Sequence, residues 1–125
     1  MLFHSTRGND FGRTFEEVLM QGLAKDGGLF MPDFWPKVDI EKLRTKTTFT
    51  EIAKEIVPLF TSSSFNKDEV IKILDTTWHD FSNEDIAPLK YLDGDNAILE
   101  LFHGPTAAFK DFGLQLAAAF FNEVL

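Results

Sequence analysis

The feature that most constrains the fold is a pattern that occurs three times, a hydroxyl or amide side chain followed three residues later by a glutamate. The pairs are Thr14 and Glu17, Thr48 and Glu51, and Asn66 and Glu69. In each pair the two side chains can satisfy each other's free backbone amides, as they do at the start of a helix. Apolar residues at helical spacing follow each pair, so the sequence predicts a mainly helical region over residues 14–81.

Other local signals predict where these helices end. We expect the first helix to include Leu23 and to stop at the glycine pair 27–28, and the second to end or kink at Pro58. Asp39 is expected to cap a short turn of helix, and residues 29–36 to be extended. The third helix has an apolar stripe that consists of Val70, Ile73, Leu74, Thr77, Trp78 and Phe81.

The pattern changes after residues 82–88, where we place a domain boundary. A short strand over 89–92, a turn at "DGDN" and a buried strand over 97–102 are expected to lead into a final helix. The predicted fold class is α/β, with a mainly helical domain at 1–85 and the first βα unit of an incomplete domain at 86–125. One βα unit cannot cover its own sheet edge, so we expect the chain to stop inside a larger α/β domain.

A lysine stands at the expected start of that last helix. Helical spacing places Lys110 on one apolar face together with Gly113, Leu114, Ala117 and Phe121. We therefore expect its side chain to line a buried or pocket-facing stripe close to the positive end of the helix dipole. Both effects favour the free amine, which forms Schiff bases with carbonyls such as pyridoxal phosphate. A solvated lysine is the alternative, and spacing alone leaves both open.

The residues around Lys110 carry a resemblance to a known family. Residues 99–113 read "LELFHGPTAAFKDFG" and resemble the cofactor-lysine motif of threonine synthases, H-G-P-T-x-A-F-K-D-F-G, at every fixed position. The stretches "HSTRG" and "TFEEVLMQGLAKDGGLFMP" resemble the N-terminal domain of the same family. The matching segments follow in the right order and together span nearly the whole chain.

This resemblance implies a fold, a cofactor and a reaction. The fold is that of the tryptophan synthase β subunit, PLP fold type II, and the cofactor is pyridoxal 5′-phosphate. The implied enzyme is a carbon–oxygen lyase acting on a phosphate ester, which converts O-phospho-L-homoserine and water to L-threonine and phosphate. Phosphate leaves from the γ carbon of the substrate, and water adds at the β carbon.

The resemblance also assigns roles to individual residues. Lys110 is the residue that forms the Schiff base with the cofactor and then acts as acid and base at the substrate carbons. Phe109 is expected to shape the cofactor pocket, although ordinary core packing is an equal alternative. Thr106 either donates a hydrogen bond to the substrate or caps the helix, and Asp111 is expected to cap the helix. His103 is expected to hydrogen-bond the loop.

Composition excludes several partners. The net charge of −8 and the pI of about 4.7 argue against nucleic acid and anionic membranes as partners. No cysteine, export signal or long apolar run is present, so we expect a cytoplasmic location. The three histidines are scattered without ligand spacing, which predicts no metal site. Arg7 could serve a phosphate or a subunit contact, but we expect a structural or surface role.

Threonine synthases continue well beyond the last residue of this sequence. The glycine-rich loop for the cofactor phosphate, the partner of the ring nitrogen and most substrate contacts have no counterpart in residues 1–125. We therefore expect these residues alone to be inactive and to self-associate through residues 97–125. Two alternatives stay open: a threonine synthase-like phospholyase that releases phosphate without making threonine, and a truncated, non-catalytic scaffold or interaction module.

Overall fold

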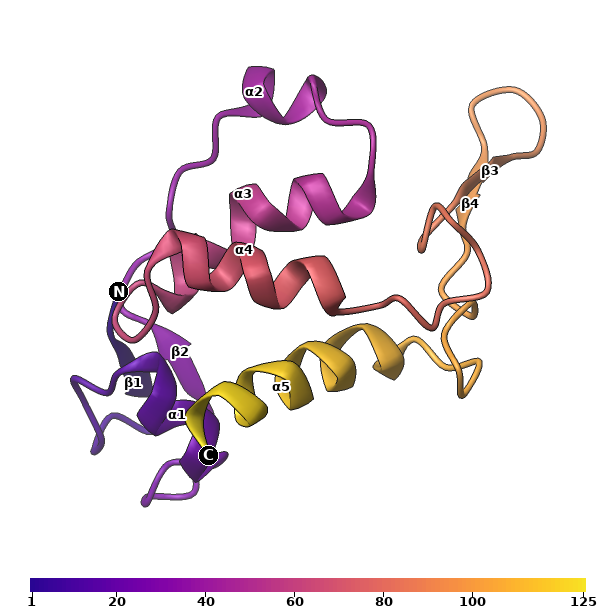
Figure 1. Ribbon diagram of the computed structural model, residues 1–125. Helices are drawn as coiled ribbons and strands as arrows, with labels where there is room; N and C mark the ends of the chain where they lie inside the picture. Colours follow the sequence, from indigo (N-terminus) through magenta and orange to yellow (C-terminus); the bar gives the residue numbers. More distant parts are fainter.

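The computed structural model describes residues 1–125 and contains five helices and four short strands (Figure 1). The helices are α1 (Phe15–Gln21), α2 (Ile40–Arg44), α3 (Phe49–Thr61), α4 (Lys67–Thr76) and α5 (Lys110–Val124). The strands are β1 (Phe3–Ser5), β2 (Phe30–Pro32), β3 (Leu89–Tyr91) and β4 (Ala97–Leu99). None of the helices combines the length and the apolar character needed to cross a membrane.

The three predicted capping boxes are confirmed at the starts of α1, α3 and α4. At α3, the Thr48 N–H donates to Glu51 Oε2 at 3.1 Å, and the Glu51 N–H donates to Thr48 Oγ1 at 3.2 Å. Asp39 caps α2 as predicted, because its carboxylate accepts a hydrogen bond from the Lys42 N–H at 3.1 Å. Local sequence signals therefore determine where four of the five helices begin.

One predicted helix end is wrong, and at Pro58 the helix does not end, which leaves the predicted kink as the alternative. Helix α1 stops at Gln21 because Gly22 adopts a φ of 73°, a left-handed conformation that glycine tolerates, and Leu23 lies beyond the helix with 58% of its surface exposed. Pro58 lies inside α3, which continues to Thr61. A proline removes one helical hydrogen bond, and here the apolar packing of α3 outweighs that loss.

The extended segment predicted for residues 29–36 contains β2, which pairs with the unpredicted strand β1. The pairing is antiparallel, with Phe3 opposite Pro32 and Ser5 opposite Phe30. Strands of three residues are too short to show the alternating pattern on which a sequence prediction of a strand depends. This small sheet lies beside α1 near the N-terminus (Figure 1).

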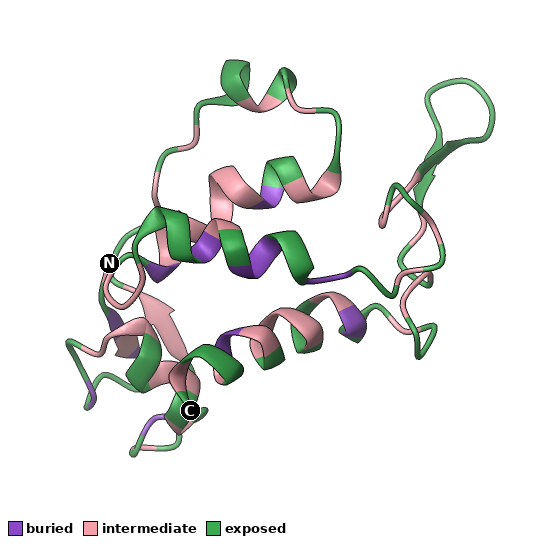
Figure 2. Ribbon diagram, in the orientation of Figure 1, coloured by how far each residue is buried: buried purple, intermediate pink, exposed green.

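One hydrophobic core joins the helices. Helix α3 packs along α4, and α5 returns to contact both α1 and α4. The buried cluster consists of Ala53, Val70, Ile73, Leu74, Trp78 and Phe120 (Figure 2). The stripe predicted on the third helix is therefore confirmed from Val70 to Trp78, although α4 itself ends at Thr76. The domain boundary at 82–88 stays a prediction.

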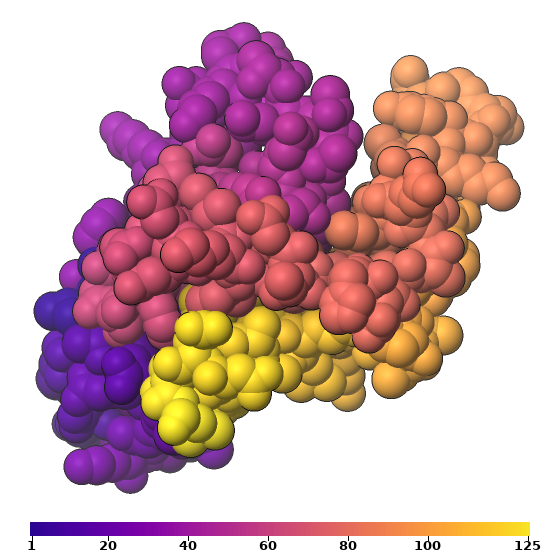
Figure 3. Space-filling view, viewed as in Figure 1, coloured from indigo at the N-terminus to yellow at the C-terminus, as the bar shows by residue number.

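The strands β3 and β4 form an antiparallel hairpin that projects from the helical body (Figures 1 and 3). Leu89 lies opposite Leu99, and Tyr91 lies opposite Ala97. The short strand at 89–92 and the turn at "DGDN" are confirmed, but the predicted buried strand is wrong, because every residue of both strands is exposed. The apolar residues of β4 face solvent because the hairpin leaves the helical layer instead of packing on it.

Candidate functional site

Lys110 is the first residue of α5, at the helix start that the sequence pattern predicts. The preceding residue, Phe109, occupies the N-cap position with helical backbone angles and makes no side-chain cap. Both side chains are exposed, and Phe109 retains 65% of its accessible surface. Phe109 and Lys110 therefore both lie, exposed, at the N-terminal end of α5.

The prediction of a buried or pocket-facing stripe is wrong for Lys110 itself, which is exposed, although Gly113 and Ala117 of that stripe line an apolar pocket. Leu114 is 64% exposed, and Gly113 is also exposed. The face that packs against the other helices instead carries Phe112 and Phe120. Lys110 lies two residues before Phe112, about 200° away around the helix axis. Lys110 therefore lies outside the packed stripe, and its side chain is exposed.

Asp111 is buried, with 4% of its surface exposed, and both of its carboxylate oxygens contact Thr106. The Thr106 hydroxyl donates to Oδ1 at 2.7 Å, and the Thr106 N–H donates to Oδ2 at 2.9 Å. Mainly because of the bond from the Thr106 hydroxyl, the pKa of Asp111 is lowered, although burial opposes this shift. Asp111 therefore ties the preceding turn to the helix, and neither it nor Thr106 makes the predicted side-chain cap.

The turn before α5 is also tied to the segment that follows α4. The main-chain oxygen of His103 accepts hydrogen bonds from the Ser82 N–H at 2.9 Å and the Ser82 hydroxyl at 3.1 Å. The His103 ring lies 2.8 Å from Glu100 Oε2, so this histidine hydrogen-bonds within the loop, as expected. In the first turn of α5, the Phe112 oxygen accepts a bond from Nε1 of the buried Trp78 at 3.0 Å.

Arg7 lies far along the sequence from this turn and has a structural partner. Its Nη1 donates to the main-chain oxygen of Asp26 at 3.0 Å, within the turn that the sequence "KDGG" forms. The Asp26 carboxylate accepts a bond from the buried Ser5 hydroxyl at 2.6 Å. Sequence analysis missed three residues of this cluster: the buried Ser5, the buried Asp10, whose main-chain oxygen accepts the Ser5 N–H at 2.7 Å, and the partly buried Asp26. Single polar residues in loops carry no periodic signal that would indicate such positions.

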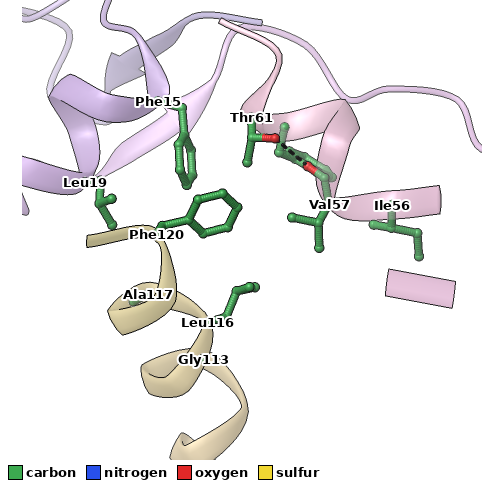
Figure 4. Close-up of a pocket in the computed structure, with 10 residues that line it drawn as sticks. Phe15, Leu19, Ile56, Val57, Thr61, Gly113, Leu116, Ala117 and Phe120 are labelled. Carbon is green, nitrogen blue, oxygen red and sulfur yellow. Dashed lines mark hydrogen bonds between the residues drawn. The ribbon is translucent and has the colours of Figure 1, made fainter. Parts of the chain in front are cut away.

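An apolar pocket of about 360 Å³ lies between α1, α3 and α5 (Figure 4). Phe15 and Phe120 face each other at one end, with ring centroids 5.0 Å apart. The Thr61 hydroxyl in its lining is used within α3, where it donates to the Val57 oxygen at 3.3 Å. The pocket offers apolar surface without a titratable group, and Lys110 is not among its lining residues.

Comparison with known proteins places this geometry in a family. The family described as the threonine synthase N terminus matches residues 2–78. Threonine synthase from Pseudomonas aeruginosa is 40% identical over 127 residues, which cover 100% of this chain and 27% of that protein. Threonine synthase-like 2 from Xenopus laevis is 39% identical, with coverage of 91% of this chain and 25% of that protein.

The similarity to this family extends to the three-dimensional structure. The crystal structure of PLP-bound threonine synthase from Brucella melitensis matches 100% of this chain with a TM-score of 0.92 and 34% identity, and the match covers 27% of that protein. The chain thus spans about a quarter of the length of these relatives. Because the family model matches residues 2–78 and a solved member matches the α/β fold over the whole chain, the chain belongs to the threonine synthase family.

Proposed function

We propose that this chain is the N-terminal part of a pyridoxal phosphate-dependent threonine synthase, in which Lys110 holds the cofactor. The proposed enzyme converts O-phospho-L-homoserine and water to L-threonine and phosphate. The observation that supports this most strongly is the position of Lys110. It begins α5 inside the complete motif "HGPTAAFKDFG", in a chain that matches a relative named as PLP-bound.

The residues around Lys110 fit such a cofactor chemically. A primary amine binds an aldehyde covalently, and the amine of Lys110 takes part in none of the ion pairs of the structure. The neighbouring carboxylate of Asp111 is turned toward Thr106. These features leave the amine accessible and without a counter-ion.

When bound, pyridoxal phosphate supplies an aldehyde and an electron-withdrawing ring. In the proposed scheme Lys110 binds it through Nζ and later, as a free amine, holds and moves protons at the substrate carbons. In the same scheme the exposed ring of Phe109, the residue before Lys110, would contribute an apolar wall to the cofactor pocket. Phosphate leaves from the γ carbon of the substrate, and water adds at the β carbon.

We propose Thr106 as a substrate contact with one specific property. Its hydroxyl donates a hydrogen bond to Asp111 Oδ1 at 2.7 Å, so the hydroxyl oxygen is available to a ligand only as a hydrogen-bond acceptor. That chemistry suits the ammonium group of the substrate and does not suit its phosphate. The division into residues 1–85 and 86–125, with the second part beginning a PLP fold type II domain, is part of the same proposal.

The test uses the complete protein that contains these residues. Borohydride reduction with pyridoxal phosphate, followed by peptide mapping, is expected to label Lys110. Lys110→Ala is expected to abolish phosphate release while circular dichroism stays unchanged, because the stem of an exposed lysine contributes little packing. Lys72→Ala, which removes an exposed lysine from α4, is the matched control and should retain activity. A label on another lysine, or near-normal turnover by Lys110→Ala, would refute the proposal.

A second candidate is a phospholyase, favoured by the 39% identity to threonine synthase-like 2 from Xenopus laevis. Both enzymes would release phosphate from O-phospho-L-homoserine, so the organic product distinguishes them. Equal amounts of threonine and phosphate support the synthase, and phosphate without threonine supports the phospholyase. A truncated, non-catalytic scaffold predicts neither product from the complete protein.

A further inference from the structure

The turn before Lys110 is built around one buried carboxylate. Asp111 accepts both the N–H and the hydroxyl of Thr106, and it forms none of the ion pairs of the structure. A carboxylate that is 96% removed from solvent and has no cationic partner is uncommon, because burying a charge requires compensating hydrogen bonds. Here both compensating bonds come from a single residue of the preceding turn.

Gly104 shows how closely the turn follows this carboxylate. A Cβ atom at position 104 would lie 2.4 Å from Asp111 Oδ2 and 2.5 Å from Asp111 Cβ, so only glycine fits. The Gly104 oxygen accepts a hydrogen bond from the Ala107 N–H at 2.9 Å. Ala107 itself has a φ of 55°, a left-handed conformation that is unfavourable for a residue with a Cβ atom. The Asp111 contacts hold a turn that includes this strained residue.

A second fixed point lies two residues after Lys110. One residue after Asp111, the Phe112 oxygen accepts the Trp78 Nε1–H at 3.0 Å, which fixes the first turn of α5 against the end of α4. Phe112 also packs edge-on against Phe49 and Phe81, with ring centroids 5.5 and 5.0 Å apart. The two residues that follow Lys110 are thus both held in place, while the Lys110 side chain is exposed and forms no ion pair.

We propose that Asp111 is a positioning residue for Lys110, whose carboxylate clamps the turn 104–107 onto the first turn of α5 and, by facing Thr106, leaves the lysine amine without a counter-ion. This inference rests on the proposed function for its catalytic consequence. The clamp itself is a property of residues 1–125 and can be tested without the cofactor.

The first arm uses the 125-residue chain and measures amide hydrogen exchange by NMR. The Thr106 amide should be protected in the wild type and should exchange at least about tenfold faster in Asp111→Ala, because its acceptor is gone. Asp111→Asn retains one acceptor oxygen and should give an intermediate rate. Glu123→Gln, an exposed change on the same helix, is the control and should leave the rate unchanged. Equal Thr106 exchange in the wild type and Asp111→Ala would overturn the clamp.

Gly104→Ala provides a second route to the same disruption, because the added methyl group displaces the Asp111 carboxylate while Asp111 is still present. It should speed Thr106 exchange as Asp111→Ala does. If one variant fails to fold, the other still decides the question. Normal Thr106 protection in a folded Gly104→Ala would equally overturn the clamp.

The second arm uses the complete, cofactor-loaded protein. Asp111→Ala should lower kcat by about 10-fold to 100-fold, the cost expected for a displaced catalytic group, with KM changed by less than about threefold. The rate of borohydride-trapped labelling of Lys110 should fall in parallel, and Asp111→Asn should restore part of it. Unchanged labelling and kcat in Asp111→Ala would refute the positioning role. If borohydride trapping labels another lysine in the wild type, the proposed function is wrong. The hydrogen-exchange measurement on Thr106 then tests the clamp by itself.

Discussion

Replacing Phe120 by alanine should uncouple α5 from the rest of the chain, whereas the same change at Phe109 should not. Phe120 is 1% exposed and contacts Phe15 and Phe65, with ring centroids 5.0 and 5.2 Å apart. Phe109, on the same helix, is 65% exposed and belongs to no aromatic pair of the structure. The two substitutions remove the same atoms from opposite environments.

The expected magnitudes follow from these exposed fractions. A buried phenylalanine removes about 150–250 Å² from water, which at about 25 cal/mol per Å² gives an upper value of ~4–6 kcal/mol. The unfolded chain already buries part of that area, so we expect the free energy of unfolding to fall by about 3–5 kcal/mol in Phe120→Ala. In Phe109→Ala the loss should be about 1 kcal/mol or less, since most of the ring is already in water.

Urea unfolding followed by circular dichroism on the 125-residue chain measures both values. The native baseline of Phe120→Ala should also show less helix, because the C-terminal half of α5 would lose its main contact. If Phe120→Ala costs no more than Phe109→Ala, α5 does not share a core with α1 and α4, and the structural basis for placing Lys110 is wrong. In the complete protein, Phe109→Ala should weaken cofactor binding without this loss of stability.

Three further predictions concern stability and association. The pKa values of Asp10, Asp26 and Asp111 are lowered chiefly by hydrogen bonds from Arg13, Ser5 and Thr106, so their stabilisation is complete above about pH 4 and is lost as the pH falls through the lowered values. The free energy of unfolding should therefore be nearly constant from about pH 7 to 5 and fall below about pH 4, and a rise on acidification would contradict this. Thr48→Ala should cost about 1 kcal/mol in urea unfolding by removing the cap of α3, while Thr48→Ser should cost little; equal losses would show that the cap contributes nothing. Sedimentation of the 125-residue chain should show self-association that Ile98→Lys and Leu114→Glu weaken, because both side chains are exposed apolar groups, and a wild-type monomer at all concentrations would disprove it.

Sequence signals succeeded where a local pattern determines the structure. The capping pairs and Asp39 placed four helix starts, and the α4 stripe predicted core residues such as Val70 and Leu74. The motif likewise placed Lys110 in the first turn of the last helix. In all these cases the determining contacts join residues close together in the chain.

The predictions were wrong where burial depends on contacts between residues far apart in the chain, or on the absence of such contacts. Helical spacing grouped Lys110 with Leu114 correctly, but it could not tell which of two apolar faces the other helices would cover. The apolar pattern of β4 predicted burial, yet residues 1–125 provide no layer over the hairpin. Asp111 was expected to cap the helix, but it contacts Thr106 instead, because the turn over residues 104–107 brings the two side chains together.

The bond between Trp78 Nε1 and the Phe112 oxygen gives this chain a built-in optical reporter. Trp78 is 4% exposed at the junction of α4 and α5, whereas the only other tryptophan, Trp35, is 68% exposed. In a Trp35→Phe background the emission maximum and quenching by iodide would monitor a single indole. A red shift would then report that the first turn of α5 has separated from Trp78. The formation or loss of this contact, two residues from Lys110, could be followed in real time without cofactor or substrate.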